Sequence, residues 1–338
     1  FKIITLATAL EEKLVDLNND TFFDSGGIKV ENATLHCWKH GGHGNQTFLE
    51  VVENSCNPGF VQLGLKIGKD TLFNYIKNFG FGKKTGVDLN GEGSGILFNE
   101  NKIGLVELAT TAFGQGVSVT PIQQITAVSA AINGGYLYKP YIVKSLNEPE
   151  TNTVIKENSK QLVRKVLSEE TSEKVRYALE SVVTNGTGRP AFIDKYRVGG
   201  KTGTAQKVKN GRYMVGNYIV SFMGFLPADD PKVIVYVAVD NAKGVTQYGG
   251  TIAAPIARNI LLDAIDALEI EERIGWSEKE YNYYDKKYIE IPITPANLHN
   301  ADGTYTESPN VAETITYKDG RWQHRYGGKR CFKIIKKF

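Results

Sequence analysis

The stretch Gly200-Lys201-Thr202-Gly203-Thr204-Ala205 is the part of the sequence from which the fold is interpreted. Its glycines leave bare backbone on both sides of a lysine and two hydroxyls. A ligand can therefore lie against the backbone while a cation and two hydrogen-bond donors face it, an arrangement that suits an anion. The β-branched and aromatic runs at 213–225 and 232–239 predict two strands that pair beside it. We interpret the stretch as one strand of a sheet with an anion-binding edge.

Hydrophobic spacing and turn signals on either side of this strand predict a mostly helical first half and a further helix after the sheet. Residues 18–45, rich in Gly, Asn and Asp, are expected to be an irregular loop with one short strand at 28–30. Extended segments are expected at 136–146 and 152–163. Helices are expected at 3–17, 46–54, 59–68, 70–78, 106–113, 121–133, 168–183 and 253–268. This order of elements predicts an α+β fold in which helices flank a few antiparallel strands.

Composition narrows the classes of function. The 338 residues carry 40 basic and 37 acidic side chains, a net charge of +3, without a basic stripe of the kind that binds nucleic acid. No apolar run reaches the roughly 18–20 residues of a membrane span, and no signal peptide opens the chain. Three cysteines do not make a disulfide framework, and Cys331 is expected to be a lone thiol. From residue 269 the sequence becomes charged and tyrosine-rich, which predicts a domain at 1–268 and an appendage of unknown fold at 269–338.

Three short motifs carry the chemistry. Lys2 falls in the first turns of an apolar helix, Ser55-Cys56-Asn57 falls in a turn between two helices, and Lys201-Thr202-Gly203 lies on the strand. Together they resemble the SxxK, SxN and KTG motifs of penicillin-binding proteins and serine β-lactamases, whose fold has an antiparallel sheet flanked by helices. Further segments are similar to class B penicillin-binding proteins, closest to the sporulation and elongation types of endospore-forming Gram-positive bacteria: 42–44, 55–58, 79–82, 110–116 and 199–206.

The resemblance implies a role for each motif residue. The nucleophilic serine would lie three residues before Lys2, upstream of residue 1, and Lys2 would be its base. Ser55 would relay a proton, and Asn57 would hold Lys2 or the substrate amide. Lys201 would supply positive potential. The carboxylate of a D-Ala-D-Ala stem peptide would be bound by Thr202, Gly203 and Thr204, with the Thr204 N–H as half of the oxyanion hole.

Each of these residues also has a purely structural interpretation. Lys2 alone would be read as a solvated helix lysine, and Ser55 and Asn57 as turn or cap residues that bond their own backbone. Threonine is common in β-strands because of its β-propensity, so Thr202 and Thr204 could be there for that reason alone. The combination of all three motifs in the family's order and wide spacing favours catalysis.

The resemblance further implies a membrane-anchored peptidoglycan D,D-transpeptidase that β-lactams acylate. It would act on the extracytoplasmic face of the cell membrane, be anchored by an N-terminal helix absent from this sequence, and work with a membrane glycosyltransferase. Two alternatives are a serine β-lactamase and a non-catalytic penicillin-binding receptor or scaffold. Turnover of a chromogenic cephalosporin would distinguish a β-lactamase from a transpeptidase, which should stay acylated. Release of D-Ala from a donor peptide would distinguish a transpeptidase from a non-catalytic receptor or scaffold.

A metal site is a separate hypothesis. Cys37, His43 and Cys56 offer two thiolates and an imidazole, ligands that suit zinc, and Asp24 or His40 is the expected fourth ligand, with His36 also near in sequence. If Ser55 and Asn57 face the active site, the side chain of Cys56 between them should face away. A structural zinc would then hold the catalytic turn from behind. The alternative is a small buried thiol with Trp38 in the core.

Overall fold

The computed structural model describes residues 1–209 and 212–272, and the backbone of 315–318, 321–326 and 329–331. The chain divides into two compact units, Phe1–Ile270 and Glu271–Phe338. In the second unit the described residues form a three-stranded antiparallel sheet of β12 (Ile315–Lys318), β13 (Arg321–Tyr326) and β14 (Lys329–Cys331). Apart from residues 269–272, the other residues of the expected appendage, and the thiol of Cys331, lie outside what the structure describes.

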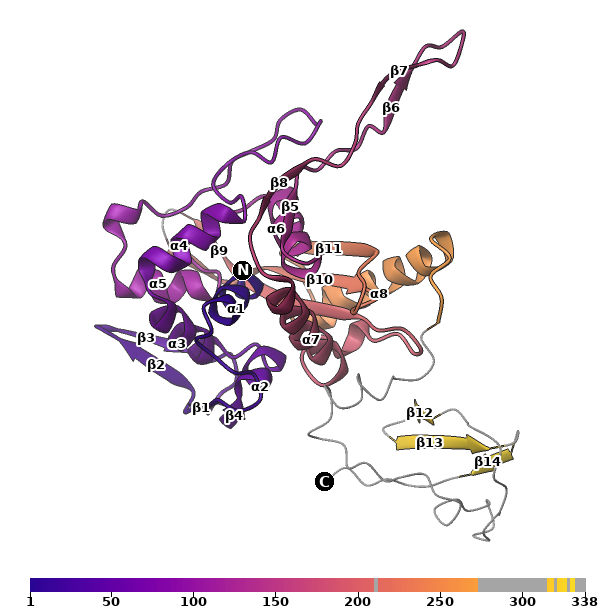
Figure 1. The fold of residues 1–338 in the computed structure, drawn as a ribbon. Coiled ribbons are helices and arrows are strands. Elements are labelled where there is room, and N and C mark those ends of the chain that lie inside the picture. The colour runs from indigo at the N-terminus through magenta and orange to yellow at the C-terminus, as the bar shows by residue number, and fades with distance from the viewer. Residues whose placement is uncertain (210–211, 273–314, 319–320, 327–328, 332–338) are drawn as a thin grey trace. The chain divides into compact units, whose positions relative to one another are not determined.

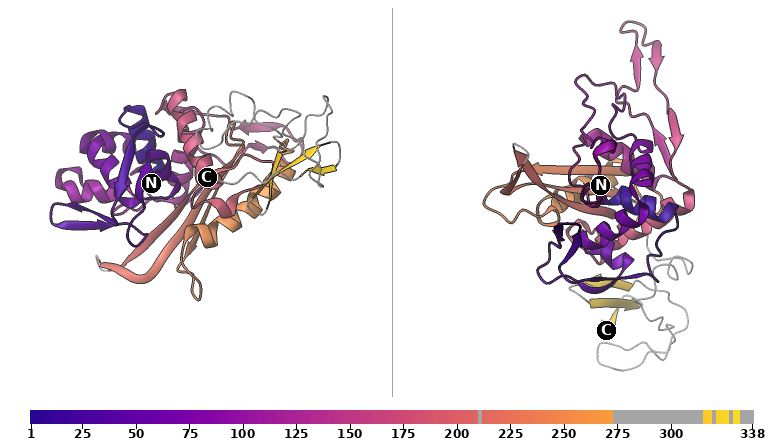
Figure 2. Two further views of the ribbon diagram at one scale, coloured as in Figure 1. Left: turned by 90° about the horizontal axis from the view of Figure 1, so that it is seen from below. Right: turned by 90° about the vertical axis from the view of Figure 1, so that its left-hand side faces the viewer.

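The first unit is built on a three-stranded antiparallel sheet in the order β11-β10-β9. Its strands are β9 (Gly199–Lys209), β10 (Arg212–Leu226) and β11 (Val233–Asp240). Figure 2 shows the helices of the first half of the chain on one side of this sheet and α8 (Gly249–Ala267) on the other. A core cluster centred on Phe222 of β10 and Leu261 of α8 joins the helix to the sheet. The sheet is thus fixed from both sides, and the expected α+β architecture is confirmed.

The helices of the first half surround α1 (Lys2–Glu11), eight of whose ten residues are buried. Figure 1 shows α1 in the middle of this group. The neighbouring helices are α2 (Phe48–Glu53), α3 (Asn57–Ile67), α4 (Lys69–Asn78), α5 (Leu105–Ala112), α6 (Pro121–Ile132) and α7 (Glu169–Thr184), with short 3-10 turns at Glu100–Lys102 and Arg189–Ala191. Lys2, in the first turn of α1, is half-buried at the edge of this group. No helix in the described residues is both long and apolar enough to cross a membrane.

Short two-stranded sheets complete the first unit. They are formed by β1 (Thr21–Asp24) with β4 (Gly44–Thr47), β2 (Gly27–Val30) with β3 (Ala33–His36), β5 (Tyr136–Tyr138) with β8 (Leu162–Lys165), and β6 (Ser145–Asn147) with β7 (Val154–Glu157). In Figure 1 the β6 and β7 hairpin extends away from the helices as an arm. The other pairs lie closer to the body of the unit.

Most expected helices shift by one or two residues at their ends, and three differences from the sequence-based expectation are larger. The first helix ends at Glu11 rather than at residue 17, because Lys13 takes a left-handed φ of 54° that a continuing helix does not allow. Residues 18–45 contain the first three strands and the start of a fourth rather than one, since four-residue polar strands lack the alternation that reveals a strand. Helix α8 begins at Gly249 rather than at 253, in a glycine pair that sequence propensity disfavours.

The glycines of β9 also serve the packing of the sheet. A Cβ on Gly200 would lie 2.4 Å from the ring of Phe222, and one on Gly203 would lie 2.5 Å from Ser221 Oγ. Gly249 at the start of α8 is equally close, since its Cβ would lie 2.3 Å from the Ser221 carbonyl oxygen and 2.5 Å from that of Gly203. The bare backbone therefore lets strand β10 and helix α8 approach β9.

Substituting Gly249→Ala should destabilise the protein by about 1–3 kcal/mol, because the added methyl forces α8 away from β9. The urea midpoint of unfolding measures the effect. Thr251→Ala, at an exposed position of the same helix, should leave the midpoint nearly unchanged. Equal midpoints for both variants would contradict the close approach.

Candidate active site

Lys2 is the centre of the site. Its ammonium nitrogen donates to Asn57 Oδ1 at 2.7 Å, to the Ser55 carbonyl oxygen at 2.8 Å and to Ser55 Oγ at 3.0 Å. These three acceptors use all three N–H donors of a charged lysine. The nitrogen also lies 5.3 Å from the centroid of the Phe60 ring, on α3. The structure thus joins the lysine of α1 to the Ser55-Cys56-Asn57 turn, more than fifty residues away in the sequence.

The backbone of Ser55 explains how one residue offers Lys2 two oxygens. Ser55 has a φ of 53°, in the left-handed region that is uncommon for residues other than glycine. It lies between the end of α2 at Glu53 and the start of α3 at Asn57. This conformation turns both the carbonyl and the hydroxyl of Ser55 toward Lys2. Strained backbone of this kind is often found at functional sites.

The amide of Asn57 is held at both ends. Its Oδ1 accepts from Lys2, and its Nδ2 donates to the carbonyl oxygen of His36 in β3 at 3.3 Å. The side chain therefore presents its oxygen, and not its nitrogen, to the lysine. Asn57 links the Ser55-Cys56-Asn57 turn to the small sheet of β2 and β3.

Strand β9 supplies the second group of polar side chains. Lys201 is only 5% exposed, and its Nζ donates to the carbonyl oxygen and the Oγ1 of Thr202, each at 3.4 Å. Thr204 is exposed, and its Oγ1 accepts a 3.3 Å hydrogen bond from the backbone N–H of Gly249, where α8 begins. The positive end of the α8 dipole thus adds to the Lys201 cation. This side of the site is suited to an anion.

Burial changes the protonation of both lysines. It lowers the pKa of Lys2 from 10.5 to about 8, although the nearby thiols of Cys56 and Cys37 act in the opposite direction. Burial, followed by repulsion from Lys2, lowers the pKa of Lys201 well below 10.5. A neutral Lys2 keeps two N–H donors for the Ser55 carbonyl and Asn57, while its lone pair accepts from the Ser55 hydroxyl. Near neutral pH the lysine can therefore change between acid and base with its neighbours in place.

The low pKa of Lys2 gives a pH-dependent prediction. If neutral Lys2 accepts the proton of a nucleophile, acylation by a β-lactam should rise about tenfold per pH unit up to about pH 8 and then level off. Stability should also depend on pH, because between about pH 8 and 10.5 Lys2 is protonated in the unfolded chain and neutral in the folded one. The free energy of unfolding therefore rises with pH across that window, and this contribution is lost as pH falls through 8. Stopped-flow acylation at a series of pH values measures the profile, and a flat rate below pH 8 would contradict it.

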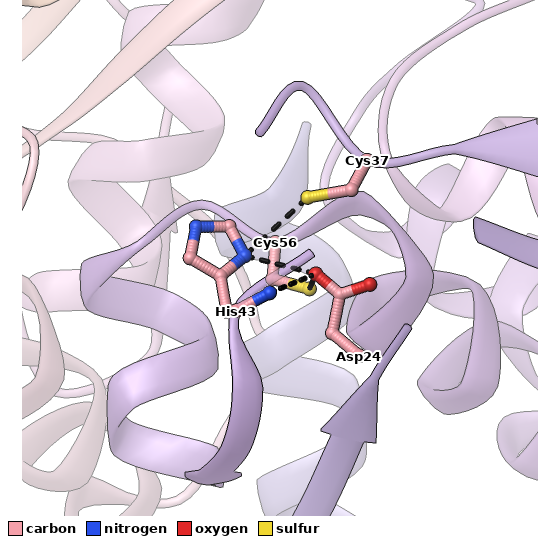
Figure 3. A group of neighbouring side chains, drawn as sticks. All are labelled: Asp24, Cys37, His43 and Cys56. Atoms are coloured by element: carbon pink, nitrogen blue, oxygen red, sulfur yellow. Dashed lines mark hydrogen bonds and ion pairs between the residues drawn. The ribbon is translucent and has the colours of Figure 1, made fainter. Parts of the chain in front are cut away.

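A second cluster gathers around Cys56, the middle residue of the Ser55-Cys56-Asn57 turn, and Figure 3 shows its four side chains. Ligand atoms of Asp24, Cys37, His43 and Cys56 all lie within 4.8 Å of one another. Asp24 Oδ2 is 2.9 Å from His43 Nδ1 and 3.3 Å from Cys56 Sγ, and Cys37 Sγ is 3.3 Å from His43 Nδ1. Asp24 and Cys56 are almost completely buried. The side chain of Cys56 thus faces away from Lys2 while its two neighbours face it.

The donor set of this cluster fits a tetrahedral zinc ion. Ligand bonds of about 2.0–2.3 Å around zinc place neighbouring donor atoms roughly 3.3–3.8 Å apart, close to the distances in the cluster. A hydrogen bond from Cys56 lowers the pKa of Cys37 and favours its thiolate, whereas the same hydrogen bond, followed by burial, raises the pKa of Cys56, so a bound metal would have to displace the Cys56 proton. Burial raises the pKa of Asp24, but hydrogen bonds led by those from Cys37 and His43 outweigh it and hold the pKa at about 2. The fourth donor in the cluster is Asp24, whereas His36 and His40 are exposed and outside it.

One glycine holds the loop that carries these donors. Gly42 has a φ of 76°, and a Cβ there would lie 2.3 Å from both the Asp24 carbonyl oxygen and the Gly26 nitrogen. The chain before His43 can pack against Asp24 only because Gly42 has no side chain. Two residues of the cluster that are 19 positions apart are thereby brought into contact.

Trp38 is not a core residue, since 48% of it is exposed. Its ring packs edge-on against His43, with 5.4 Å between centroids, and against Tyr248, with 6.3 Å. Its indole N–H donates to the Asn54 carbonyl oxygen at 2.8 Å, next to Ser55. Trp38 therefore connects the cluster around Cys56, the end of α2 next to Ser55, and Tyr248, which precedes α8. Nothing in the sequence near Tyr248 indicated this contact.

Residues 1–262 match the family model described as "Penicillin binding protein transpeptidase domain". The chain is 62% identical over 292 residues to "Stage V sporulation protein D" of Bacillus subtilis, covering 86% of this chain and 45% of that protein. It is 30% identical over 312 residues to a "Peptidoglycan D,D-transpeptidase FtsI homolog" of Mesostigma viride, covering 85% and 51%. The chain therefore spans about half the length of these curated relatives.

Solved structures show the same fold. Penicillin-binding protein 3 of Mycobacterium tuberculosis in complex with aztreonam superposes with a TM-score of 0.73 at 28% identity, covering 80% of this chain and 62% of that one. The transpeptidase domain of penicillin-binding protein 3 from Burkholderia pseudomallei gives a TM-score of 0.72 at 27% identity, covering 81% and 80%. Both agree with a sheet between two groups of helices.

Proposed function

Because the chain belongs to the penicillin-binding protein transpeptidase family, we propose that it is the catalytic part of a peptidoglycan D,D-transpeptidase. The observation that carries the proposal is the contact of the buried Lys2 amine with both Ser55 Oγ and Asn57 Oδ1. A lysine whose pKa lies near 8 and whose hydrogen bonds join two other family motifs is equipped to accept and return a proton. The catalytic domain corresponds to residues 1–268, and 269–338 are an appendage.

The nucleophile is the serine that the family places three residues before Lys2. Neutral Lys2 takes the proton of the serine hydroxyl while the serine oxygen attacks the carbonyl carbon of the penultimate D-Ala. The bond between this carbonyl and the terminal D-Ala then breaks. The proton passes from Lys2 through the Ser55 hydroxyl, 3.0 Å away, to the leaving amine. An amine of a second stem peptide then replaces the serine ester. Each proton that the reaction moves thus has a carrier among these side chains.

Strand β9 holds the substrate. Lys201 and the hydroxyls of Thr202 and Thr204 receive the terminal carboxylate beside Gly203, where α8 adds its positive end. The backbone N–H of Thr204, together with that of the serine, stabilises the oxyanion. A β-lactam enters as a mimic of D-Ala-D-Ala, which agrees with the aztreonam and ampicillin complexes of the M. tuberculosis relative.

The test uses the protein with the residues upstream of Phe1 included. A transpeptidase should be acylated by a penicillin, stay acylated, and release D-Ala from a donor peptide. Rapid turnover of a chromogenic cephalosporin would instead indicate a β-lactamase. Penicillin binding without D-Ala release would indicate a receptor or scaffold.

We also infer that the cluster of Asp24, Cys37, His43 and Cys56 holds a structural zinc ion. Zinc would supply no reaction step there, since Cys56 faces away from Lys2; it would fix the turn that carries Ser55 and Asn57. Metal analysis of the purified protein, with Cys56→Ser as the control, tests the inference. Absence of zinc from the parent protein would end it.

The remaining features of the proposal follow the relatives. The name of the B. subtilis relative supports a role in sporulation. A cell-wall enzyme of this family would act on the extracytoplasmic face of the membrane, anchored by a helix upstream of this sequence, beside a membrane glycosyltransferase. Labelling of the protein in cells with a fluorescent penicillin, followed by fractionation, tests this location.

A further inference from the structure

We propose that Thr187 is a positioning residue that sets the hydroxyl of Thr202 for the substrate carboxylate. The inference rests on the proposed function and adds to it a residue outside the three motifs. Thr187 lies in the loop after α7, between Thr184 at the end of that helix and the turn Arg189–Ala191. None of the sequence patterns that indicated the active site includes it.

Close packing fixes the backbone around Thr187. A Cβ on the preceding Gly186 would lie 2.5 Å from the Glu53 carbonyl oxygen, at the end of α2. A Cβ on Gly250, in the first turn of α8, would lie 2.6 Å from the carbonyl oxygen of Thr187 itself. The loop is therefore held between the helix that precedes the catalytic turn and the helix that follows the sheet. Little room remains for Thr187 to shift.

Hydrogen bonds then connect Thr187 to both sides of the site. Its backbone N–H donates to the Glu53 carbonyl oxygen at 3.0 Å, and its hydroxyl donates to the same oxygen at 3.1 Å. Its Oγ1 also lies 3.0 Å from Thr202 Oγ1. Thr202 Oγ1 in turn accepts from Lys201 at 3.4 Å. One side chain thus joins the end of α2, two residues before Ser55, to the Lys201-Thr202 pair.

Counting protons shows why this connection matters. A hydroxyl has one hydrogen to donate and two lone pairs. While the Thr187 hydrogen points to Glu53, the Thr202 hydrogen is directed to Thr187 and is not available to a ligand. The Glu53 carbonyl oxygen already accepts the backbone N–H of Thr187, so the Thr187 hydroxyl can turn and donate to Thr202 without leaving that carbonyl unbonded.

This rotation would release the Thr202 hydrogen for a carboxylate. A carboxylate accepts hydrogen bonds only, so it needs the donor form of Thr202. Thr187 supplies the compensating hydrogen bond to Thr202 Oγ1 when that form is selected. The residue touches no reacting atom. Its contribution is the orientation of a hydroxyl that does bind the substrate.

The experiment compares Thr187→Val, which keeps the shape but loses the hydroxyl, with Thr187→Ser, which keeps it. In the protein with its upstream residues, Thr187→Val should slow acylation by a penicillin up to about tenfold, the upper range for one hydrogen bond between neutral groups, and Thr187→Ser should restore most of the rate. With the methyl ester of the same penicillin, whose carboxylate is blocked, Thr187→Val and the parent should react at similar rates. A purely structural role for Thr187 would slow both substrates alike.

A double-mutant cycle completes the test. Thr202→Val alone should also slow acylation, and adding Thr187→Val to it should have little further effect, because the two hydroxyls act as one unit. Additive losses, equal losses on acid and ester, or a Thr187→Val rate equal to the parent's would each overturn the inference. A parent protein that is not acylated by the penicillin at all would overturn the proposed function itself, and this inference with it.

Discussion

Replacing Lys2 with methionine should reduce acylation by a penicillin about 10²–10⁴-fold, the usual contribution of a positioned general base. Methionine has similar length and no proton acceptor, so the serine would lose the group that takes its proton. Ser55 and Asn57 would at the same time lose the amine to which both are bonded. The second-order rate of acylation, measured with the upstream serine present, checks the prediction.

Lys2→Arg is the matched variant. It keeps a cation and its N–H donors, but a guanidinium is not deprotonated in proteins, so it cannot serve as a base. We therefore expect Lys2→Arg to be nearly as slow as Lys2→Met, whereas Lys29→Met, at an exposed position on β2, should match the parent. Near-parental acylation by Lys2→Arg would mean that the charge of Lys2 matters and its basicity does not.

If the cluster of Asp24, Cys37, His43 and Cys56 binds zinc as proposed, removing the ion should lower the thermal midpoint of the protein by roughly 8–16 °C. An ion present at about 1,000 times its dissociation constant stabilises the folded state by about 4 kcal/mol, and each kcal/mol shifts the midpoint of a domain of this size by about 2–4 °C. The cause is local, since the cluster ties β1, the loop before β4 and the start of α3 together. Differential scanning calorimetry before and after chelation measures the shift.

Variants of three residues test this prediction, two inside the cluster and one outside it as the control. Asp24→Asn and His43→Ala remove donors of the cluster, and both should lower the midpoint and reduce the bound zinc. His40→Ala, at an exposed position three residues before His43, should change neither. Loss of zinc from the His40 variant alone would place the fourth ligand where the structure does not.

The sequence was most informative where a chemical motif and a periodic pattern coincide. Lys2 lies on a helix with regular apolar spacing, and Lys201 lies on a strand rich in glycine and threonine, so the element that holds each residue could be predicted. The opposite facing of Cys56 relative to Ser55 and Asn57 was also expected, although it arises from the left-handed Ser55 and the start of α3 at Asn57 rather than from an extended turn. These features depend on residues that are neighbours in the sequence.

Contacts between distant residues could not be predicted in the same way. Thr187 reaches Thr202 only because Gly186 and Gly250 let three elements meet, and neither glycine carries a signal for that contact. Trp38 has a large apolar side chain of the kind expected in a core, yet it is half exposed and packs against Tyr248. The short strands of residues 18–45 are stabilised by pairing with each other, which local propensity does not record.

The alternate facing of the Ser55-Cys56-Asn57 turn has a consequence for how this segment can vary in length. Ser55 and Asn57 contact Lys2 from one side, and Cys56 contacts Asp24 from the other. Inserting or deleting a single residue here would change which side chains face which partner, so that a thiol would face the Lys2 amine and a hydroxyl or amide would face the cluster of Asp24, Cys37 and His43. A point substitution alters one of these contacts at a time, whereas a change in the length of this segment would disable the Lys2 site and the cluster around Cys56 together.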